Sequence, residues 1–447
     1  MAPRFDLVIR NGMVATPNGL EALDIGVAGG RIAAFGMLAQ ADAAATYDAN
    51  GLTVLPGVID TQVHFREPGL EHKEDLATGT AAAAMGGVTA VFEMPNTKPS
   101  TATAAELGEK LKRASGRTHC DYAFYVGATA ENVENLPALE KLPGCAGVKL
   151  FMGASTGDLL VADDATLERV LSHGHRRMAV HCEDEYRMRD RRHLTEVPGA
   201  TPHLHPEWRD AESALLATQR LVRLARKVGR RVHVLHVTTA QEMDFLAGHK
   251  DIATVETTPQ HLTLAAPDCY DRLGTFAQMN PPIRSAEHRD ALWQALRAGV
   301  VDVIGSDHAP HTKEEKNKPY PQSPSGMPGV QTLLPLLLDH MSRGQLTLQR
   351  LVDLTSAGAQ RVFGLAGKGR IALGYDADFT VVDLKARKTI EESWLQSKCG
   401  WSPFTGMTVT GWPVATIVRG HFAMRDGALG PAGGRPVRFG ETLQPDA

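Results

Sequence analysis

The chain has 447 residues and a formal net charge of −4 at pH 7, with 43% hydrophobic and 22% charged residues. These are the proportions of a globular protein, so a disordered chain, a collagen and a coiled-coil rod are excluded as overall descriptions. The chain also lacks the excess of basic residues with which proteins neutralise a phosphate backbone. We therefore expect a globular protein whose main partner is not a nucleic acid.

The sequence has no visible feature of a secreted or membrane protein. Residues 1–10 lack the apolar core of a secretory signal. No segment reaches the about 18 unbroken apolar residues that a spanning helix needs. The five cysteines are scattered without a Cys-x-x-Cys pair, which argues against a disulfide framework and a zinc ribbon. We expect a reduced, cytoplasmic chain without membrane contact.

Both ends of the chain are predicted to be β-structure. Short apolar segments bounded by glycine, asparagine or aspartate occupy residues 6–12, 25–35, 376–383 and 415–422. A Gly-Gly pair lies inside the second segment and predicts a strand, a turn and another strand. We expect the two ends to build one small β domain together.

The middle of the chain alternates between strand-like and helix-like segments. Apolar, β-branched runs lie at residues 52–59, 88–92, 122–126, 147–151, 178–180, 232–235, 252–256 and 300–304. Helix-like segments lie between them at residues 77–85, 104–114, 164–172, 212–228 and 287–298. Eight such units predict an α/β fold with a (β/α)8 TIM-like barrel. A doubly wound sheet is the alternative, but no Gly-x-Gly-x-x-Gly follows the first strand to favour it.

Polar residues gather where the predicted strands end. Four of them, His64, His181, His236 and Asp307, follow apolar runs, and Lys149 lies within the run 147–151. A single histidine at a strand end is more often a hydrogen-bonded core residue than a metal ligand. The carboxyl ends of barrel strands meet at one mouth, however, and five unpartnered polar groups buried there would be costly. Imidazole and carboxylate together predict a zinc-like metal site.

Lys149 needs a separate explanation because an ammonium group repels a divalent cation. A desolvated lysine loses its charge readily. The neutral amine can react with carbon dioxide to give an anionic carbamate, which could bridge two metal ions. The predicted metal site therefore includes a carboxylated Lys149.

Eight motifs along the chain resemble those of one known family. They occupy residues 56–69, 94–97, 148–151, 181–184, 235–239, 279–284, 306–311 and 373–380. On these motifs the chain resembles the cyclic amidohydrolases of the amidohydrolase superfamily, namely dihydroorotases with allantoinases and hydantoinases as relatives. The resemblance implies a barrel over residues 55–364 and a small β-sandwich domain from residues 1–54 and 365–447. It also implies a homodimer, because dimers are usual among these relatives.

The resemblance implies roles for the residues at the barrel mouth. His64, His181 and His236 would bind zinc, carboxylated Lys149 would bridge two ions, and Asp307 would be both a ligand and the general base. The family usually carries His-x-His after the first strand, but the first position here is Gln62. An amide oxygen is a weaker ligand than imidazole, so the expected content is one or two zinc ions. The alternative is a metal-poor, non-catalytic protein that binds a partner such as a carbamoyltransferase.

The resemblance also implies a substrate. In dihydroorotases the residues matching Arg66, Asn96 and His311 hold the exocyclic carboxylate of the ring, with His311 either protonated or a neutral donor. Asn280 would contact the ring itself. The expected reaction is the interconversion of dihydroorotate and N-carbamoyl-L-aspartate in pyrimidine biosynthesis, and another cyclic amide such as allantoin or a hydantoin is the alternative.

Two alternatives stay open, one for Arg66 and one for the loop after the last strand. Arg66 could form a salt bridge with a carboxylate near in sequence or space, the candidates being Glu67, Glu71 and Glu93. The polar stretch 313–323 after the last strand could be a mobile lid, although a solvated loop is the simpler expectation.

Overall fold

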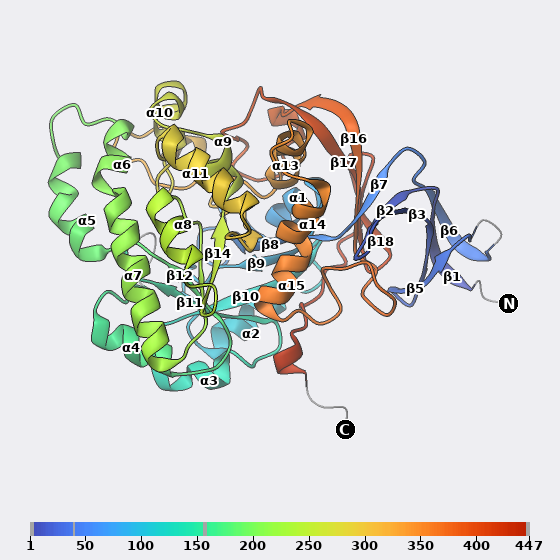
Figure 1. The fold of residues 1–447 in the computed structure, drawn as a ribbon, viewed down its shortest axis with the longest axis horizontal. Coiled ribbons are helices and arrows are strands. Elements are labelled where there is room, and N and C mark those ends of the chain that lie inside the picture. The colour runs from blue at the N-terminus through green and yellow to red at the C-terminus, as the bar shows by residue number, and fades with distance from the viewer. Residues whose placement is uncertain (1–3, 39–40, 155–158, 444–447) are drawn as a thin grey trace.

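The computed structural model describes residues 4–38, 41–154 and 159–443. Its centre is a nearly closed barrel of parallel strands that follow one another around the barrel in chain order (Figure 1). The strands are β8 (Val58–Val63), β9 (Val88–Glu93), β10 (Asp121–Gly127), β11 (Cys145–Phe151), β12 (Met178–His181), β13 (Val232–Val234), β14 (Ala253–Thr257) and β15 (Val303–Ile304). The first and last strands meet where the amide of His64 donates to the carbonyl of His308, 2.7 Å away. The predicted (β/α)8 barrel is confirmed.

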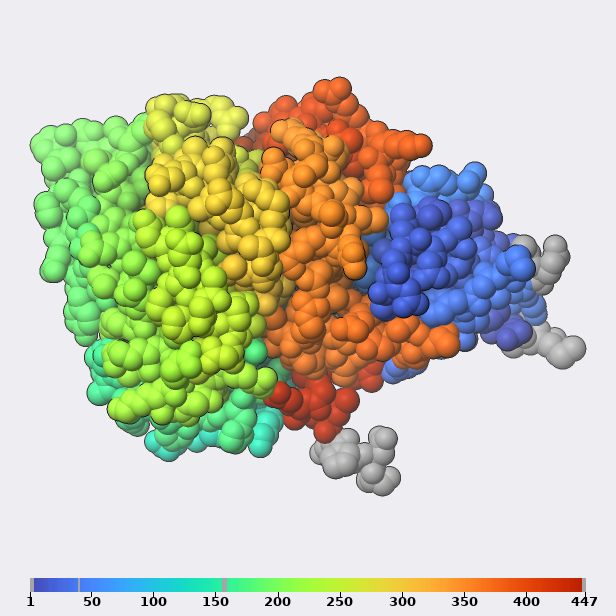
Figure 2. All heavy atoms as spheres, viewed as in Figure 1, coloured from blue at the N-terminus to red at the C-terminus, as the bar shows by residue number. Residues whose placement is uncertain are grey.

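Helices surround the barrel and connect its strands (Figure 1). They are α1 (Leu76–Met85), α2 (Ala104–Ala114), α3 (Leu136–Leu139), α4 (Asp164–Ser172), α5 (Glu185–Arg191), α6 (His205–Trp208), α7 (Ala211–Val228), α8 (Ala240–Ala247), α9 (Pro259–Thr263), α10 (Asp268–Leu273), α11 (Ala286–Arg297), α12 (Lys313–Lys316), α13 (Leu333–Ser342), α14 (Leu348–Val352) and α15 (Gly358–Phe363). In the space-filling view, atoms of the middle of the chain, coloured green to yellow, form one side of the face shown (Figure 2). Within the described residues, no helix is both long and apolar enough to cross a membrane.

Helix α7 shows how local sequence sets these elements. The side chain of Asp210 accepts a hydrogen bond from the amide of Ser213 and so caps the first turn. Gly229 adopts φ of 74° and ends the helix in the left-handed conformation that suits glycine. Between these signals the apolar residues recur at helical spacing and face the barrel, as predicted for residues 212–228.

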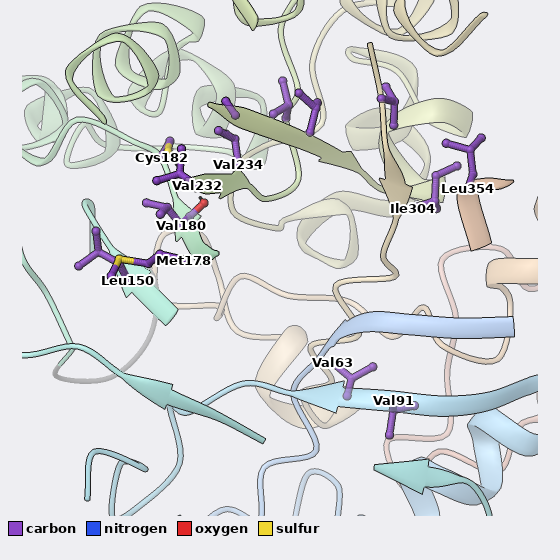
Figure 3. Packing of buried hydrophobic residues seen from close by; sticks show 14 of the residues in the cluster. Val63, Val91, Leu150, Met178, Val180, Cys182, Val232, Val234, Ile304 and Leu354 are labelled. Carbon is purple, nitrogen blue, oxygen red and sulfur yellow. Dashed lines mark hydrogen bonds between the residues drawn. The ribbon is translucent and has the colours of Figure 1, made fainter. Parts of the chain in front are cut away.

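The apolar core has two layers. Outward-facing side chains of the strands pack against the helices, and Figure 3 shows members of this cluster such as Val180, Val232 and Val234. A second cluster, which includes Phe92 and Phe363, fills the barrel interior. Because successive side chains of a strand point to opposite faces, the two layers alternate along each strand. The packed interior leaves the carboxyl ends of the strands as the place for a site.

Both ends of the chain contribute to the β-structure beside the barrel (Figure 1). One sheet has the order β5-β4-β1-β6 and the other the order β19-β18-β17-β16-β7-β2-β3. The strands are β1 (Phe5–Arg10), β2 (Met13–Thr16), β3 (Gly19–Ala22), β4 (Asp24–Ala28), β5 (Arg31–Gly36), β6 (Ala43–Asp48), β7 (Thr53–Pro56), β16 (Phe379–Thr389), β17 (Thr408–Val418), β18 (His421–Arg425) and β19 (Ala428–Leu429). The prediction that the two ends build one small β domain is confirmed.

Two predicted strands are wrong in detail. The run 52–59 is two strands, because the chain leaves the second sheet at Gly57 and enters the barrel as β8. The run 415–422 spans the hairpin of β17 and β18, which turns at Arg419 and Gly420.

The domain boundaries at 54/55 and 364/365 stay predictions. Residues 435–437 lie against β10 of the barrel, where the amide of Val437 donates to the carbonyl of Tyr122.

A buried ion cluster joins the barrel to the β domain, and it leads to a stability prediction. Nζ of Lys368 lies 2.6 Å from Asp121 on β10, 2.5 Å from Asp378 and 3.4 Å from Asp376. Replacing Lys368 by methionine leaves these carboxylates without their shared cation, so the free energy of unfolding should fall by about 3–5 kcal/mol. Denaturant unfolding measures this.

The matched control for this prediction is Lys385→Met. Lys385 is exposed on β16, so its replacement should change the free energy of unfolding by less than about 0.5 kcal/mol. A Lys368→Met protein as stable as this control would contradict the assigned role of the ion cluster.

Candidate active site

A small cavity lies among the residues at the carboxyl ends of the barrel strands. Its volume is about 20 Å³, and its lining residues are Gln62, His64, Arg66, Lys149, Phe151, His181, His236, Asn280, Asp307, Ala309, Ser325 and Gly326. That volume holds about one water molecule. The structure thus brings together most of the predicted site residues. Asn96 and His311 are outside the lining and instead contact His64 and Arg66.

The parallel register of the strands produces this convergence. Lys149 is paired with Ala179, and Phe151 with His181, so the ends of β11 and β12 are level. His236 follows β13 by two residues, and Asp307 follows β15 by three. Side chains from five different strands therefore reach one mouth, as the barrel fold requires.

Three of the site residues have a strained backbone. Arg66, His236 and Asp307 have φ values of 65°, 37° and 45°, in the left-handed region that non-glycine residues rarely adopt. Such strain costs about 1–3 kcal/mol per residue and clusters at functional sites. The folded chain therefore holds these side chains in orientations that the local sequence does not favour.

The contacts of His64 call for a cation. Its Nδ1 lies 2.8 Å from the amide oxygen of Asn96, which can only accept, so Nδ1 carries the ring hydrogen. Nε2 then presents a lone pair to a carboxylate oxygen of Asp307 at 3.1 Å. Two acceptors at this distance repel unless a proton or a metal ion lies between them. Burial lowers the pKa of His64 and disfavours the proton, so a metal ion fits.

His181 and His236 form a second pair of metal-compatible nitrogens. Nε2 of His181 lies 2.8 Å from Glu183, which fixes the hydrogen there and leaves Nδ1 as a lone pair. That Nδ1 lies 3.1 Å from Nε2 of His236. Nitrogens on one tetrahedral zinc lie about 3.4 Å apart for Zn–N bonds of about 2.05 Å. The observed separation is close to this value.

Glu183 is itself held in place. Although burial raises its pKa, the charge of Arg209 and the contact with His181 keep it well below its usual range. Nε of Arg209 donates to Oε1 of Glu183 at 3.0 Å. An ionised Glu183 therefore orients His181 in the way that outer carboxylates orient metal-binding histidines. Neither Glu183 nor Arg209 was predicted to have a role in the site.

Lys149 lies in the same cavity and is almost completely buried. Its Nζ is 4.4 Å from the ring centre of Phe151. In the described ranges it forms no ion pair with a carboxylate. Burial lowers its pKa to about 7, so a large fraction of the side chain is a neutral amine near neutral pH.

Gln62 occupies the position where a histidine was expected. Its Nε2 donates to Asp307 at 3.1 Å, while its Oε1 is buried without a hydrogen-bond partner. Over the ranges that the structure covers, no three His, Cys, Asp or Glu side chains are arranged to hold one ion. Instead there are two pairs, His64 with Asp307 and His181 with His236. A complete ligand set therefore needs Lys149 or Gln62 as a further member.

Arg66 is a buried cation without a carboxylate partner in the described part of the chain. Its Nε donates to the carbonyl of Pro310 at 3.1 Å, and burial lowers its pKa to about 10. Glu67 pairs with Arg117, and Glu93 pairs with Lys110. The salt bridge considered for Arg66 is therefore absent among these residues, and its charge faces the cavity.

His311 was predicted to be either protonated or a neutral donor, and its surroundings disfavour the protonated form. Burial, together with the nearby charge of Arg66, lowers the pKa of His311 to about 3. Nζ of Lys73 lies 3.0 Å from Nδ1 of His311, and Nη2 of Arg66 lies 3.3 Å from its Nε2, so a donor faces each ring nitrogen. Nε2 lies 3.1 Å from the carbonyl of Ser325. Lys73 was missed because it lies in a polar loop without a strand or helix pattern.

The stretch 313–323, for which a solvated loop was the simpler expectation, is exposed over much of its length and anchored by three buried residues. It begins with α12, and the side chains of Lys316, Tyr320 and Ser323 are buried. Oγ of Ser323 donates to the side chain of Gln278 at 2.5 Å. The segment packs against the loop that carries Asn280.

Comparisons with known proteins agree with this arrangement. The model of the amidohydrolase family matches residues 53–423. A dihydroorotase from Halobacterium salinarum is 38% identical over 437 residues, which cover 96% of this chain and 99% of the relative. An allantoinase from Rubrobacter xylanophilus is 36% identical over 449 residues, covering 96% and 97% of the two chains.

A solved structure shares the whole architecture. The L-hydantoinase from Arthrobacter aurescens superposes with a TM-score of 0.91 at 30% identity, covering 97% of this chain and 99% of its own. Enzymes of the matched family usually depend on metal ions, in agreement with the two donor pairs at the barrel mouth. The chain therefore belongs to the amidohydrolase family, as a cyclic amidohydrolase of the group that contains dihydroorotases, allantoinases and hydantoinases.

Proposed function

We propose that the protein is a zinc-dependent dihydroorotase, which hydrolyses (S)-dihydroorotate to N-carbamoyl-L-aspartate and catalyses the reverse ring closure. The observation that carries the substrate is Arg66, a buried guanidinium at the cavity without a carboxylate partner among the described residues. Dihydroorotate brings an exocyclic carboxylate, which a guanidinium can bind through two parallel hydrogen bonds. Allantoin and simple hydantoins lack this group and would leave Arg66 unpaired at a real cost.

The residues at the mouth suit hydrolysis of a ring amide. A zinc ion bound there would make water acidic enough to lose a proton near neutral pH and would polarise the ring carbonyl. Asp307 accepts the proton of the attacking water and returns it to the ring nitrogen. The carbon–nitrogen bond breaks, the carbonyl carbon becomes a carboxylate and the nitrogen leaves as the ureido NH₂ group. Arg66 and His311 orient the substrate carboxylate.

The proposed zinc ligands are His64, Lys149, His181, His236 and Asp307. Lys149 would contribute as its carbamate, formed when the neutral amine attacks carbon dioxide and releases one proton. The low pKa of about 7 supplies that amine near neutral pH. Gln62 offers only a neutral amide oxygen, so the ion nearer Asp307 should be held more loosely.

Removing Lys149 should therefore remove metal. We expect Lys149→Ala, purified without added zinc, to retain less than about a tenth of the wild-type zinc content, because each remaining donor pair is an incomplete ligand set. Elemental analysis by plasma mass spectrometry measures this without relying on activity. The control is Lys141→Ala, which removes an exposed lysine. Full zinc content in Lys149→Ala would contradict the bridging role.

The second candidate is another cyclic amide, because an allantoinase and an L-hydantoinase are among the similar proteins. A steady-state assay of dihydroorotate, allantoin and hydantoin with the same zinc-loaded preparation separates them. We expect kcat/KM for dihydroorotate to exceed the other two by at least about 10³-fold, as for a site that pairs with a specific polar group. Preference for allantoin or hydantoin would overturn the assignment. Absence of both zinc and activity in a folded protein would favour the metal-poor alternative.

A further inference from the structure

Lys316 is a buried lysine that the proposed reaction does not use. It ends the short helix α12, and its side chain is completely buried. Among the described residues it pairs with no carboxylate. The nitrogen at its end faces three backbone carbonyls and lies 5.8 Å from the ring centre of Trp401. Burying a lysine without a carboxylate partner costs free energy, which indicates that the side chain has a specific role.

The three carbonyls belong to two loops that form one wall of the cavity. Nζ of Lys316 donates to Gln278 at 3.3 Å, to Pro324 at 2.8 Å and to Gly326 at 3.1 Å. The first carbonyl lies two residues before Asn280, and the other two flank Ser325. Asn280, Ser325 and Gly326 all line the cavity. Lys316 therefore ties together the two loops from behind.

The contacts of Ser325 explain why this tie affects the cavity. In an extended segment successive carbonyls point to opposite sides. The carbonyls of Pro324 and Gly326 point to Lys316, while that of Ser325 lies 3.1 Å from Nε2 of His311. Holding the two outer carbonyls thus directs the middle one toward the residue that is proposed to orient the substrate.

His205 completes the link between the two loops. Its Nε2 lies 3.0 Å from the side-chain oxygen of Asn280 and 3.3 Å from Oγ of Ser325. The amide of Gly326 also donates to the carbonyl of Gln278 at 2.9 Å. At φ of 139° Gly326 has no room for a side chain, because a Cβ there would meet the carbonyl of Ala309. The wall is closely packed at Gly326, and the hydrogen bonds of Lys316 stabilise this packing.

We propose that Lys316 is a positioning residue that fixes the cavity wall formed by residues 278–280 and 324–326. Its role is to hold the carbonyls of Gln278, Pro324 and Gly326 so that Asn280 and Ser325 face the substrate. Because the wall contacts the substrate and not the reacting water, the effect is expected on substrate affinity. This part rests on the proposed function, whereas the effect on the wall does not.

The first test is hydrogen exchange of the full chain, compared between wild type, Lys316→Met and Lys313→Met. Lys313 lies in the same helix but is paired with Glu392 at the surface, which makes it the matched control. In Lys316→Met we expect faster exchange, by at least about tenfold, because three hydrogen bonds are lost. The amides concerned are those of Gln278, Met279, Asn280, Ser325, Gly326 and Met327. The control should exchange like wild type.

A thermal unfolding curve separates this role from a general structural one. Methionine fills similar space but leaves the carbonyls of Gln278, Pro324 and Gly326 without their donor, so the Tm of Lys316→Met should fall by no more than about 5 °C. Unchanged exchange in the two wall segments would overturn the proposal. A larger fall in Tm with faster exchange throughout the barrel would also overturn it, because it would show a general structural role.

The second test uses steady-state kinetics with dihydroorotate. In Lys316→Met we expect KM to rise about tenfold and kcat to change less than about threefold, the pattern of lost binding that is uniform between ground and transition states. A fall in kcat with constant KM would contradict the positioning role. A wild-type protein that does not open dihydroorotate would contradict the proposed function, while the exchange experiment would still decide the role of Lys316.

Discussion

Replacing Asp307 by asparagine is expected to lower kcat for dihydroorotate by about 10²- to 10⁴-fold, the contribution of a positioned general base. The amide cannot accept the proton of the attacking water. Asparagine is close in shape and tolerates the left-handed backbone at this position, where φ is 45°. The fold should therefore survive, and steady-state kinetics with a thermal unfolding curve can show loss of turnover without loss of structure.

The control for this experiment is Asp290→Asn, which changes an exposed carboxylate on α11 and should leave kcat within about twofold of wild type. The zinc content of both variants is measured, because Asp307 is also a proposed ligand. Turnover by Asp307→Asn within threefold of wild type would show that another group accepts the proton.

Replacing Arg66 by methionine is expected to change substrate preference as well as rate. Removing one partner of a buried charge pair costs about 2–5 kcal/mol, so kcat/KM for dihydroorotate should fall by about 30-fold or more. Hydantoin has no exocyclic carboxylate, so any basal rate on hydantoin should not fall. The ratio of the two kcat/KM values is the measurement, because it cancels a general loss of folded enzyme.

Arg66→Lys adds a second comparison. Lysine keeps the charge but lacks the planar fork that matches a carboxylate, so only part of the preference should return. Equal losses on dihydroorotate and hydantoin in Arg66→Met would show that Arg66 supports the site's structure and does not select the carboxylate.

The barrel and the residues at its mouth could be predicted because strand periodicity and topology carry the information. Lys149 lies within an apolar run and His181 follows one, and parallel strands in a barrel bring their carboxyl ends together. The break at Gly57 was missed because the apolar residues on both sides were assigned to one strand, although Pro56-Gly57 is a pair that marks turns. The turn at Arg419 was missed because it lacks the Asn-Gly or Asp-Gly pair that usually indicates a tight hairpin.

The supporting residues could not be predicted for a different physical reason. Lys73, His205 and Lys316 lie in loops and short helices, where contacts with distant segments determine the backbone course. Lys73 contacts the ring of His311, 238 positions along the chain, and His205 contacts the side-chain amide of Asn280, 75 positions along the chain. Neither partner is indicated by local spacing. The protonation of His311 also depended on such contacts, because Arg66 and Lys73 face it in the folded chain.

The most direct test of the central claim is the steady-state opening of dihydroorotate before zinc removal, after chelation and after zinc is restored. We expect activity to be lost with the metal and to return with stoichiometric zinc while the fold stays intact, as for a site that depends on a Lewis acid. Ring opening that is unaffected by complete zinc removal, or no opening by fully zinc-loaded protein, would contradict the account.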